Sequence, residues 1–474
     1  MPVSTKFRKV PYTVAGDSFV SSAKDLSVQR TKNMFIVPAV NSLTNTAAVY
    51  SWPGLKLWSS GTAGEYDRGI HRRLFNSKAW KVSGSTLYSI NSSGTQTNEG
   101  VIAGSSLVSI EDNGLTLIIV ADGKAYSHNG TTLSTISLSF TPVQCAYLNE
   151  RFILLADNGD VYLSDVNSTT FGNEIAFQAK SSPDETRGIS VFDQFLFVGG
   201  QNTIEPWQDI GSGNPPFSRI NGVIIENAGI ANRHCFAQTS KSLYFLGDDK
   251  KPYSLVSFQA NSIADKNPGI LEQFYSYTKE TAYMDAIKWN GYDFILFVFP
   301  TEQVFWVYCE QTGIWCELDH DDDSQFYLGK TFSWLFNKIL VGDRSNGNIY
   351  ELDSDTYQDN GVQGVRERVF RPLSGEAVGA PRAYLQMKVI QFAMETGVGS
   401  SDDNPQVLVS YSTDGGRNYS SESAISLGEE GDYQELVEDY SNRKFKDLAV
   451  KIRYVENTRF TLYDSAIYVR EAGR

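Results

Sequence analysis

The residues of this chain that are best suited to chemistry are its four histidines, its four cysteines and its many carboxylates. The histidines lie far apart along the sequence: His71, His128, His234 and His320. They form neither an H-x-x-H nor a His-Glu pattern, so we expect structural histidines rather than metal ligands or catalytic bases. The cysteines are equally scattered: Cys145, Cys235, Cys309 and Cys316. Their number and spacing fit neither a disulfide framework nor a zinc site, and we expect buried thiols.

One acidic run has side chains that could bind a cation. His320, Asp321, Asp322 and Asp323 follow one another, and carboxylate oxygens are ligands that Ca²⁺ prefers. The run lacks the glycine and the terminal glutamate of a defined calcium loop, so we expect a solvated turn. The sequence therefore predicts no metal and no cofactor.

The motifs of common enzyme classes are missing from the sequence. It contains no Gly-x-Ser-x-Gly elbow, no P-loop and no dinucleotide fingerprint. Carboxylates are abundant enough to supply the acid pair of a glycoside hydrolase. The arginines that would hold an acidic sugar are scattered along the chain: Arg72, Arg73, Arg151, Arg187 and Arg233. We assign no catalytic residue and predict that the protein is not an enzyme.

The elements that would position these residues are predicted to be β-strands. The chain has 474 residues, and its 25 Tyr and 27 Phe favour strands in two or three domains or in one large all-β body. The net charge is −14 and no basic run is present, unlike in a protein that grips duplex DNA. No stretch approaches the ~20 apolar residues of a membrane span. The N-terminus lacks the apolar core of a secretion signal, so we expect a protein made in the cytoplasm.

A repeating unit begins near Gly69, and it consists of an apolar strand, a Gly/Asp/Asn turn and a second strand that ends in Tyr or Trp. One clear copy runs from Leu115 to Val120, turns at Asp122-Gly123 and continues to Ser127. Successive copies lie about 40 residues apart, which is the spacing of four-stranded propeller blades. The chain therefore predicts an all-β fold with a β-propeller of about six to eight blades over residues 61–360.

One interval between copies, from Phe258 to Trp289, is longer than the others. Its apolar spacing loosens toward three and four from Ile270 to Tyr277 and from Ala282 to Ile287, which indicates a short helix. The hairpin that follows is rich in aromatic residues. We expect Trp306 and Trp315 to pack across its Thr-Gly turn.

The repeat stops near residue 360, and longer strands are predicted after it. They span Tyr384 to Glu395, Gln406 to Ser412, Leu448 to Val455 and Phe460 to Arg470. Their alternation predicts an antiparallel β-domain over residues 361–474, with the form of a sandwich. The first sixty residues contain few long apolar runs, and we predict an extended N-terminal arm over residues 1–60.

A strongly specified turn follows the second of these long strands. Gly415 and Gly416 supply the positive φ angles that a tight connection needs. Ser412 and Asp414 can bond to local backbone N–H groups, and Tyr419 can cover the turn. The spacing is similar to that of the Asp-box turn of sialidases and other propellers, where the motif is structural. It predicts a β-hairpin, not an enzyme.

Four segments together carry a resemblance to one family. They are Asn33 to Pro38, Trp52-Pro53-Gly54-Leu55, Val298 to Glu317, and Met394 to Tyr419. These segments are similar to parts of the tail hub (nozzle) proteins of short-tailed bacteriophages (podoviruses), also called packaged-DNA stabilisation proteins. The last segment is the most specific, because its Met-Glu-Thr-Gly-Val-Gly run and its Asp-Gly-Gly turn occur together at the family's spacing.

The resemblance implies a structural virion protein. Proteins of this family assemble as a hexameric ring below the portal and its adaptor protein, extend the DNA channel, and carry a needle or plug and fibres or spikes. A negative wall would let double-stranded DNA slide through without sequence-specific binding. The propeller and the Asp-box-like turn leave two alternatives open, namely a sialidase-like glycoside hydrolase and a glycan-binding adhesin.

Overall fold

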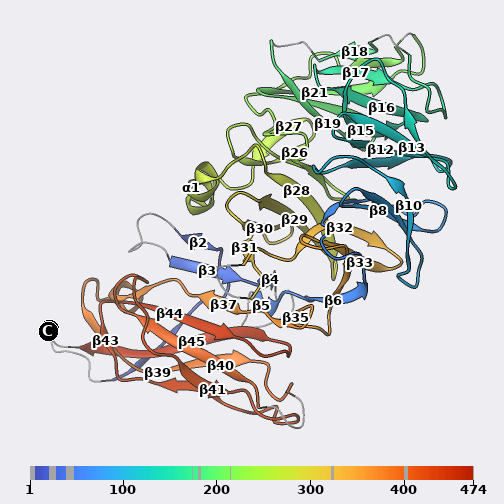
Figure 1. Cartoon of the computed structure of the whole chain (residues 1–474). Coiled ribbons are helices and arrows are strands. Elements are labelled where there is room, and N and C mark those ends of the chain that lie inside the picture. The colour runs from blue at the N-terminus through green and yellow to red at the C-terminus, as the bar shows by residue number, and fades with distance from the viewer. Residues whose placement is uncertain are drawn as a thin grey trace.

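The computed structural model describes residues 6–20, 28–38, 47–172, 175–179, 183–213, 215–321, 325–399 and 404–472. Within these ranges the chain is nearly all β, with a single α-helix, α1 (Pro268–Ser276). A β-propeller and a β-sandwich lie side by side (Figure 1). The predicted fold class is confirmed. Within the described residues, no helix is both long and apolar enough to cross a membrane.

The first blades of the propeller are antiparallel sheets of four strands that follow one another along the chain. The first comprises β7 (Asp67–Ile70), β8 (Ala79–Ser83), β9 (Thr86–Ile90) and β10 (Gln96–Val101). The second comprises β11 (Ser109–Asp112), β12 (Leu117–Ala121), β13 (Lys124–His128) and β14 (Leu133–Ile136). The third comprises β15 (Pro142–Leu148), β16 (Arg151–Ala156), β17 (Asp160–Leu163) and β18 (Phe177–Gln178).

The later blades repeat this plan. The next comprises β19 (Thr186–Phe192), β20 (Phe195–Gly200), β21 (Thr203–Asp209) and β22 (Phe217–Arg219), with β23 (Ile225–Glu226) beside β21. It is followed by β24 (Phe236–Gln238), β25 (Leu243–Leu246), β26 (Pro252–Val256) and β27 (Gln259–Ser262). After α1 come β28 (Tyr283–Trp289), β29 (Tyr292–Phe299), β30 (Val304–Cys309) and β31 (Trp315–Leu318). The helix α1 lies in the first of the two segments that suggest a helix in the sequence, whereas the second, from Ala282 to Ile287, lies largely in strand β28.

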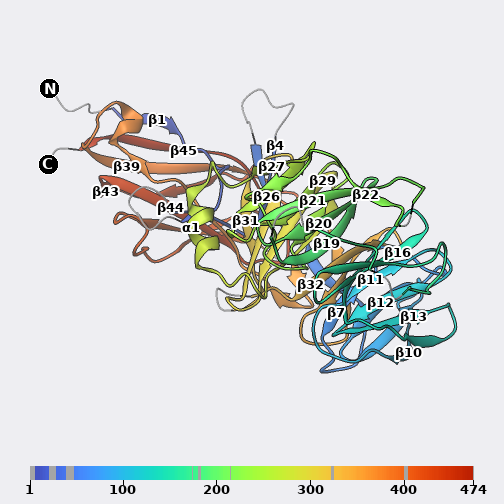
Figure 2. The ribbon, with the colours of Figure 1, turned by 90° about the horizontal axis from the view of Figure 1, so that it is seen from above.

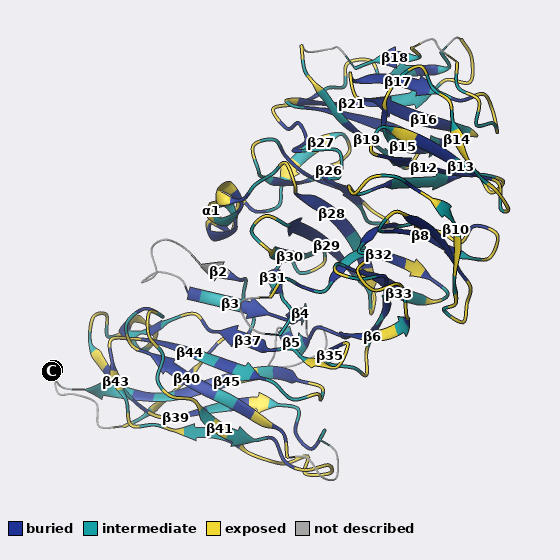
Figure 3. Cartoon of the chain, in the orientation of Figure 1, coloured by how far each residue is buried: buried dark blue, intermediate teal, exposed yellow. Residues whose placement is uncertain are grey.

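The ring of blades is closed by a strand from the N-terminal part of the chain. The last blade contains β32 (Gly329–Leu335), β33 (Lys338–Asp343) and β34 (Ile349–Asp353), and its fourth strand is β6 (Gly54–Ser59). β6 pairs antiparallel with β34, and Leu57 lies opposite Tyr350. Two short strands, β35 (Gln358–Asp359) and β36 (Val362–Gln363), extend this sheet. The middle strands of the blades are buried on both faces, because each blade packs between two others (Figure 3).

The sandwich consists of two facing sheets around an apolar core. One sheet contains β1 (Arg8–Pro11), β4 (Met34–Pro38), β5 (Ala47–Ser51), β39 (Tyr384–Met394), β42 (Val437–Tyr440), β43 (Lys444–Phe445) and β45 (Thr461–Ala472). The other contains β37 (Arg366–Val369), β38 (Leu373–Ser374), β40 (Gln406–Ser412), β41 (Ser423–Ser426) and β44 (Asp447–Tyr454). A 3₁₀ turn, η1 (Gly375–Val378), precedes β39.

The described parts of the N-terminal sixty residues are extended strands that pair with distant segments. β1 pairs with β45, and Arg8 lies opposite Val469. β4 and β5 join the same sheet of the sandwich, whereas β6 crosses to the propeller. β2 (Phe19–Val20) and β3 (Val28–Lys32) form a further antiparallel pair. The chain thus passes between the two bodies within its first sixty residues, while the exact domain boundaries at 60 and 360 stay predictions.

Candidate functional site: the junction between propeller and sandwich

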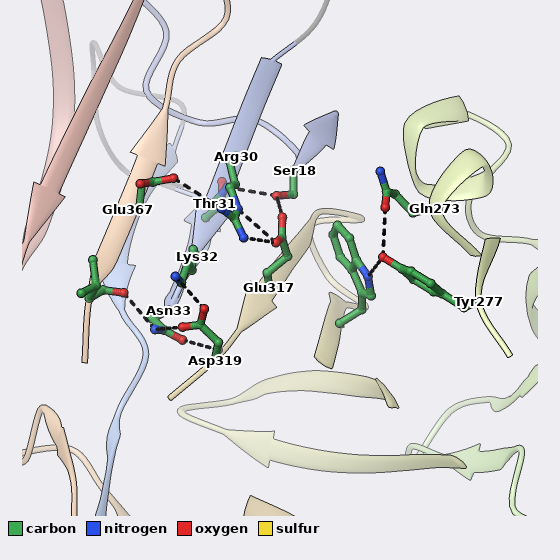
Figure 4. Close-up of polar contacts among 12 residues, drawn as sticks. Ser18, Arg30, Thr31, Lys32, Asn33, Gln273, Tyr277, Glu317, Asp319 and Glu367 are labelled. Carbon is green, nitrogen blue, oxygen red and sulfur yellow. Dashed lines mark hydrogen bonds and ion pairs between the residues drawn. The ribbon is translucent and has the colours of Figure 1, made fainter. Parts of the chain in front are cut away.

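A single hydrogen-bonded sheet runs from the propeller into the sandwich. β3 lies between β31 of a blade and β37, which in turn pairs with β44 of the sandwich (Figure 4). Lys32 lies opposite Glu317 in the parallel pair with β31 and opposite Glu367 in the antiparallel pair with β37. The blade and the sandwich therefore share backbone hydrogen bonds through one strand from the N-terminal part of the chain.

Ion pairs reinforce the blade side of β3. The Lys32 Nζ atom lies 2.6 Å from the Asp319 Oδ2 atom, and these side chains are only 2% and 15% exposed. Arg30 lies on the same strand, and one of its terminal guanidinium nitrogens lies 2.9 Å from the Glu317 Oε2 atom. Ser18 donates from its hydroxyl to the other carboxylate oxygen of Glu317 at 2.7 Å. Burial raises the pKa of Asp319 to about 6.

Asn33 connects three segments at the end of β3. Its backbone lies in the left-handed region with φ 52°, which asparagine tolerates better than most residues. The side-chain amide donates to the Val365 carbonyl at 2.9 Å, and the side-chain oxygen accepts from the Asp319 N–H at 3.0 Å. The Asn33 carbonyl accepts from the Trp52 N–H at 2.9 Å. One polar residue thus satisfies backbone groups on both sides of the junction.

The Trp52-Pro53-Gly54 turn is the second crossing point between the two bodies. Trp52 is buried, and its ring meets Phe35 and Phe294 edge-on at centroid distances of 6.1 and 5.2 Å. The Gly54 N–H donates to the Thr356 carbonyl at 2.6 Å. A Cβ atom at Gly54 would lie 2.5 Å from the Gln358 carbonyl oxygen, so only glycine fits this close approach of two backbones.

Arg368 holds the segment before β2 against β37. Its side chain is fully buried, and it donates to the Val14 carbonyl at 2.9 Å, the Gly16 carbonyl at 3.1 Å and the Thr31 hydroxyl at 2.8 Å. Burial lowers the pKa of Arg368 to about 10, so the guanidinium stays charged at neutral pH. Sequence reasoning missed Arg368 and Lys32, because buried cations at strand positions look like solvated charges until their distant partners are known.

The aromatic hairpin packs differently from the prediction. In the register of β30 and β31, Trp315 lies opposite Tyr308, whereas Trp306 lies opposite Glu317. The two tryptophans therefore do not face each other across the turn. Both meet Phe274 of α1 instead, at centroid distances of 6.3 and 5.6 Å. Each tryptophan thus packs against Phe274 of α1 rather than against the other tryptophan.

The Asp-box-like turn after β40 has the predicted hydrogen bonds. The Ser412 hydroxyl donates to the Asp414 Oδ1 atom at 2.7 Å, and that carboxylate accepts N–H groups of the following turn residues at 3.0 Å. These bonds hold the pKa of Asp414 well below its usual range. Gly415 and Gly416 have φ angles of 74° and 78°. Tyr419 lies beneath Lys451, whose ammonium is 4.4 Å from the ring centroid.

Three of the four histidines are held in structural contacts. His71 bonds to Asp112 at 2.6 Å, the His128 ring lies 4.5 Å from Trp80, and His320 bonds to Asp359 at 3.4 Å. All four cysteines are free and buried. No group of three or more metal-binding side chains occurs in the described part of the chain, and the calls on Asp322 and Asp323 lie outside it.

The structure brings together two of the scattered arginines. Arg72 and Arg233 line a cavity of about 220 Å³ in the propeller, together with Glu111, His234 and Asp285. One terminal guanidinium nitrogen of Arg72 lies 3.5 Å from the Asp285 Oδ1 atom. Burial lowers the pKa of His234 to about 4, so this ring is neutral at physiological pH. The other three arginines make separate contacts elsewhere: Arg73 with Asp112, Arg151 with the Ser164 carbonyl and Arg187 with Asp248.

Comparisons with known proteins agree with this two-part architecture. The family model described as "Bacteriophage P22 Gp10, beta-propeller" matches residues 8–357, and the model described as "Bacteriophage P22 Gp10, beta-sandwich" matches residues 376–470. The chain belongs to the P22 Gp10 family. The resemblance to tail hub proteins is thereby confirmed. The propeller model begins at residue 8, so its matched range also covers the N-terminal strands that pair with the sandwich.

One curated relative in the P22 Gp10 family spans nearly the whole chain. It is the tail hub protein gp10 of Salmonella phage P22, which is 23% identical over 431 residues, covering 84% of this chain and 87% of that protein. Among solved structures, the designed Ika8 protein is 10% identical with a TM-score of 0.41 and covers 63% of this chain and 99% of its own. The N-terminal domain of Nup159 is 10% identical with a TM-score of 0.41 and covers 68% and 98%.

Proposed function

We propose that copies of this chain form the wall of a phage tail. In this role they assemble as a hexameric ring below the portal and its adaptor protein, continue the DNA channel and retain packaged DNA. The ring also carries a needle or plug and fibres or spikes, and the protein is located in the virion after synthesis in the host cytoplasm. This proposal is supported by the two family models, because the propeller model and then the sandwich model match successive parts of the chain. So does the tail hub relative from Salmonella phage P22.

The observation that carries the proposal is the continuous sheet through β3. A ring of identical subunits closes only if each copy presents its two contact surfaces at a fixed angle. Inter-domain contacts within a chain often permit motion, whereas here backbone pairing and the buried Lys32–Asp319 ion pair hold the two bodies together. Each copy in a closed ring needs such a rigid link between its two bodies.

The acidic balance of the chain fits a channel that DNA must traverse. The net charge is −14, and a negative wall repels the phosphate backbone and so permits sliding. If these charges face the channel, replacing exposed carboxylates with amides should slow DNA ejection. Ejection that is unaltered in such variants would count against the charged wall, but not against the ring.

The experiment that tests the function is complementation of phage particles that lack this protein. Particles assembled with the wild-type chain are expected to keep their DNA protected from nuclease. Particles assembled without it should release DNA. In parallel, electron microscopy of the purified chain mixed with the portal adaptor should show six-fold rings. DNA retention without the chain, or a monomer that does not bind the adaptor, would refute the proposal.

A second function has one supporting observation, the propeller cavity lined by Arg72, Arg233 and Glu111. A glycoside hydrolase or an adhesin would bind sugar at such a site, and burial raises the pKa of Glu111 as in a general acid. Turnover of a fluorogenic glycoside that is lost in Glu111→Gln would support the enzyme. Binding on a glycan array without turnover would support the adhesin. Neither signal is expected if the chain is a tail hub alone.

A further inference from the structure

Exposed apolar side chains are concentrated in one short segment of the sandwich. Of the large apolar side chains in the described ranges, the three most exposed lie between Tyr433 and Tyr440. Tyr433 is 72% exposed, Leu436 is 76% exposed and Tyr440 is 69% exposed. Single exposed apolar residues are ordinary, whereas several within one short segment mark a surface that another molecule covers.

The charge around these side chains has one sign. The segment from residue 429 to residue 440 contains six carboxylates and no lysine or arginine, and residues 429–436 are all exposed. The loop in this segment is held against the chain that follows β39, because the Gly431 N–H donates to the Gly397 carbonyl at 3.3 Å. We name residues 429–436 the acidic end of the sandwich; Tyr440 lies opposite Val389, nearer the middle of β39.

The opposite end of the same sheet carries the complementary charge. Lys444 of β43 and Arg470 of β45 both lie opposite Gln386 of β39, and Arg8 of β1 lies opposite Val469. Lys6, Arg8, Lys9 and Lys446 are exposed there. Figure 2 shows β1, β39, β43 and β45 meeting at this end, near both termini. We name these six basic residues, together with Tyr384, the basic end.

The basic end also has an aromatic anchor. Tyr384 is 36% exposed, and the ammonium groups of Lys444 and Lys446 lie 5.0 and 5.3 Å from its ring centroid. The carboxylates Glu471 of β45 and Asp447 at the start of β44 are fewer than the cations. β39 has 11 residues and links the two ends over about 35 Å. The two ends therefore cannot touch within one copy, but they can touch between copies.

We propose that the acidic end of one copy docks on the basic end of the next copy. Unlike surfaces that meet head to tail generate a ring when the rotation closes, and this contact would be the ring contact of the proposed tail hub, on which the inference rests. Opposite charges set the register, and Tyr433 and Leu436 supply the apolar centre that is removed from water. A contact of this kind weakens as salt screens its charges.

Cysteine crosslinking tests the contact directly. The native cysteines are free and buried, so engineered surface cysteines are the reactive ones. Leu436→Cys and Tyr384→Cys lie roughly 30 Å apart within one copy along β39, too far to bridge. Under mild oxidation, neither variant alone is expected to crosslink. A mixture of the two should give dimers, and a chain carrying both changes should give a ladder up to the closed ring.

The outcomes separate this inference from the proposed function. Crosslinking by either variant alone would show like surfaces in contact and would overturn the head-to-tail model. Rings seen by electron microscopy without crosslinks in the mixture would overturn the contact and leave the tail hub intact. Absence of both rings and crosslinks would overturn both. Leu115→Cys is the matched control, because its side chain on the propeller is 68% exposed and should not crosslink.

Charge reversal supplies an independent readout. Glu435→Lys and Lys446→Glu should each weaken association about tenfold or more, because like charges then face each other. The two changes combined in one chain should restore association, since opposite charges meet again at every contact. Lys124→Glu, an exposed lysine on the propeller, should have no effect. Failure of the combined variant to recover, with both single variants folded, would contradict the pairing of these two ends.

Discussion

Gly54→Ala is expected to displace the Trp52-Pro53-Gly54 turn, where the chain crosses from the sandwich to the propeller. The new Cβ would lie 2.5 Å from the Gln358 carbonyl oxygen, 2.7 Å from the Thr356 carbonyl oxygen and 2.8 Å from the Gln358 nitrogen. All three are backbone atoms, so no side-chain rotation relieves the overlap. The strand must move away, and the 2.6 Å hydrogen bond from the Gly54 N–H to Thr356 is weakened or lost.

The expected loss follows from these two effects. Overpacking in a closely packed region destabilises by about 1–3 kcal/mol, and a buried backbone hydrogen bond contributes about 1 kcal/mol. We expect a decrease of about 3 kcal/mol in the free energy of unfolding, which corresponds to a shift of less than about 1 M in the urea midpoint, because the denaturant slope increases with protein size. Tryptophan fluorescence measures this transition well, because all eight tryptophans lie between Trp52 and Trp334 and so report on the propeller and the junction.

The matched control for this variant is Gly364→Ala. No atom lies within 4 Å of a Cβ built at Gly364, and its backbone does not need positive φ. This change should be neutral or stabilise by about 0.4–1 kcal/mol through the unfolded chain. Equal effects of the two substitutions, or no effect of Gly54→Ala, would refute the account of the crossing.

Three further predictions concern polar groups at the junction and in the sandwich. Arg368→Met should destabilise the protein by about 3 kcal/mol, because buried carbonyls lose their donor, and proteolysis of the N-terminal strands should accelerate. Arg371→Met, at an exposed position, is the control, and equal proteolysis of the two variants would argue against a structural role of the buried Arg368. Asp359→Asn should destabilise the protein more at pH 5.5 than at pH 8.5, because the hydrogen bond of Asp359 raises the pKa of His320, and the resulting stabilisation is present below the ordinary pKa of histidine and is lost as the pH rises through the raised pKa. Urea titrations in which the loss of stability is the same at both pH values would contradict this. Asp414→Ala should lower the melting temperature of the sandwich, measured by circular dichroism, at pH 7 and less so in acid, because a carboxylate with a depressed pKa stabilises the fold above its ordinary pKa and loses that contribution when it is protonated. A decrease in melting temperature that is as large in acid as at pH 7 would contradict this explanation.

The local features of the fold could be predicted because they depend on neighbouring residues. The blade hairpins are visible as apolar alternation interrupted by Gly and Asp turns, as at Asp122-Gly123, which connects β12 and β13. The Asp414 turn is likewise contained within a few residues. Helix α1 was detectable because apolar spacing near Ile270 departs from the period of a strand.

The junction could not be predicted, because its contacts join residues that are far apart in sequence. Asn33 and Asp319 are 286 positions apart, and Arg368 bonds to Val14 across 354 positions. Family resemblance identified the segment from Asn33 to Pro38, but it did not indicate that Asn33 bonds to distant segments at the junction. Lys32 illustrates the limit: in sequence it looks like an exposed charge, whereas in the fold it is buried on a strand that pairs with both β31 and β37.

The most direct test of the central claim is the native mass of the purified chain mixed with a portal-adaptor ring. The account predicts a closed complex containing six copies of the 52.7 kDa chain. A chain that remains a 52.7 kDa monomer and does not bind the adaptor would contradict it.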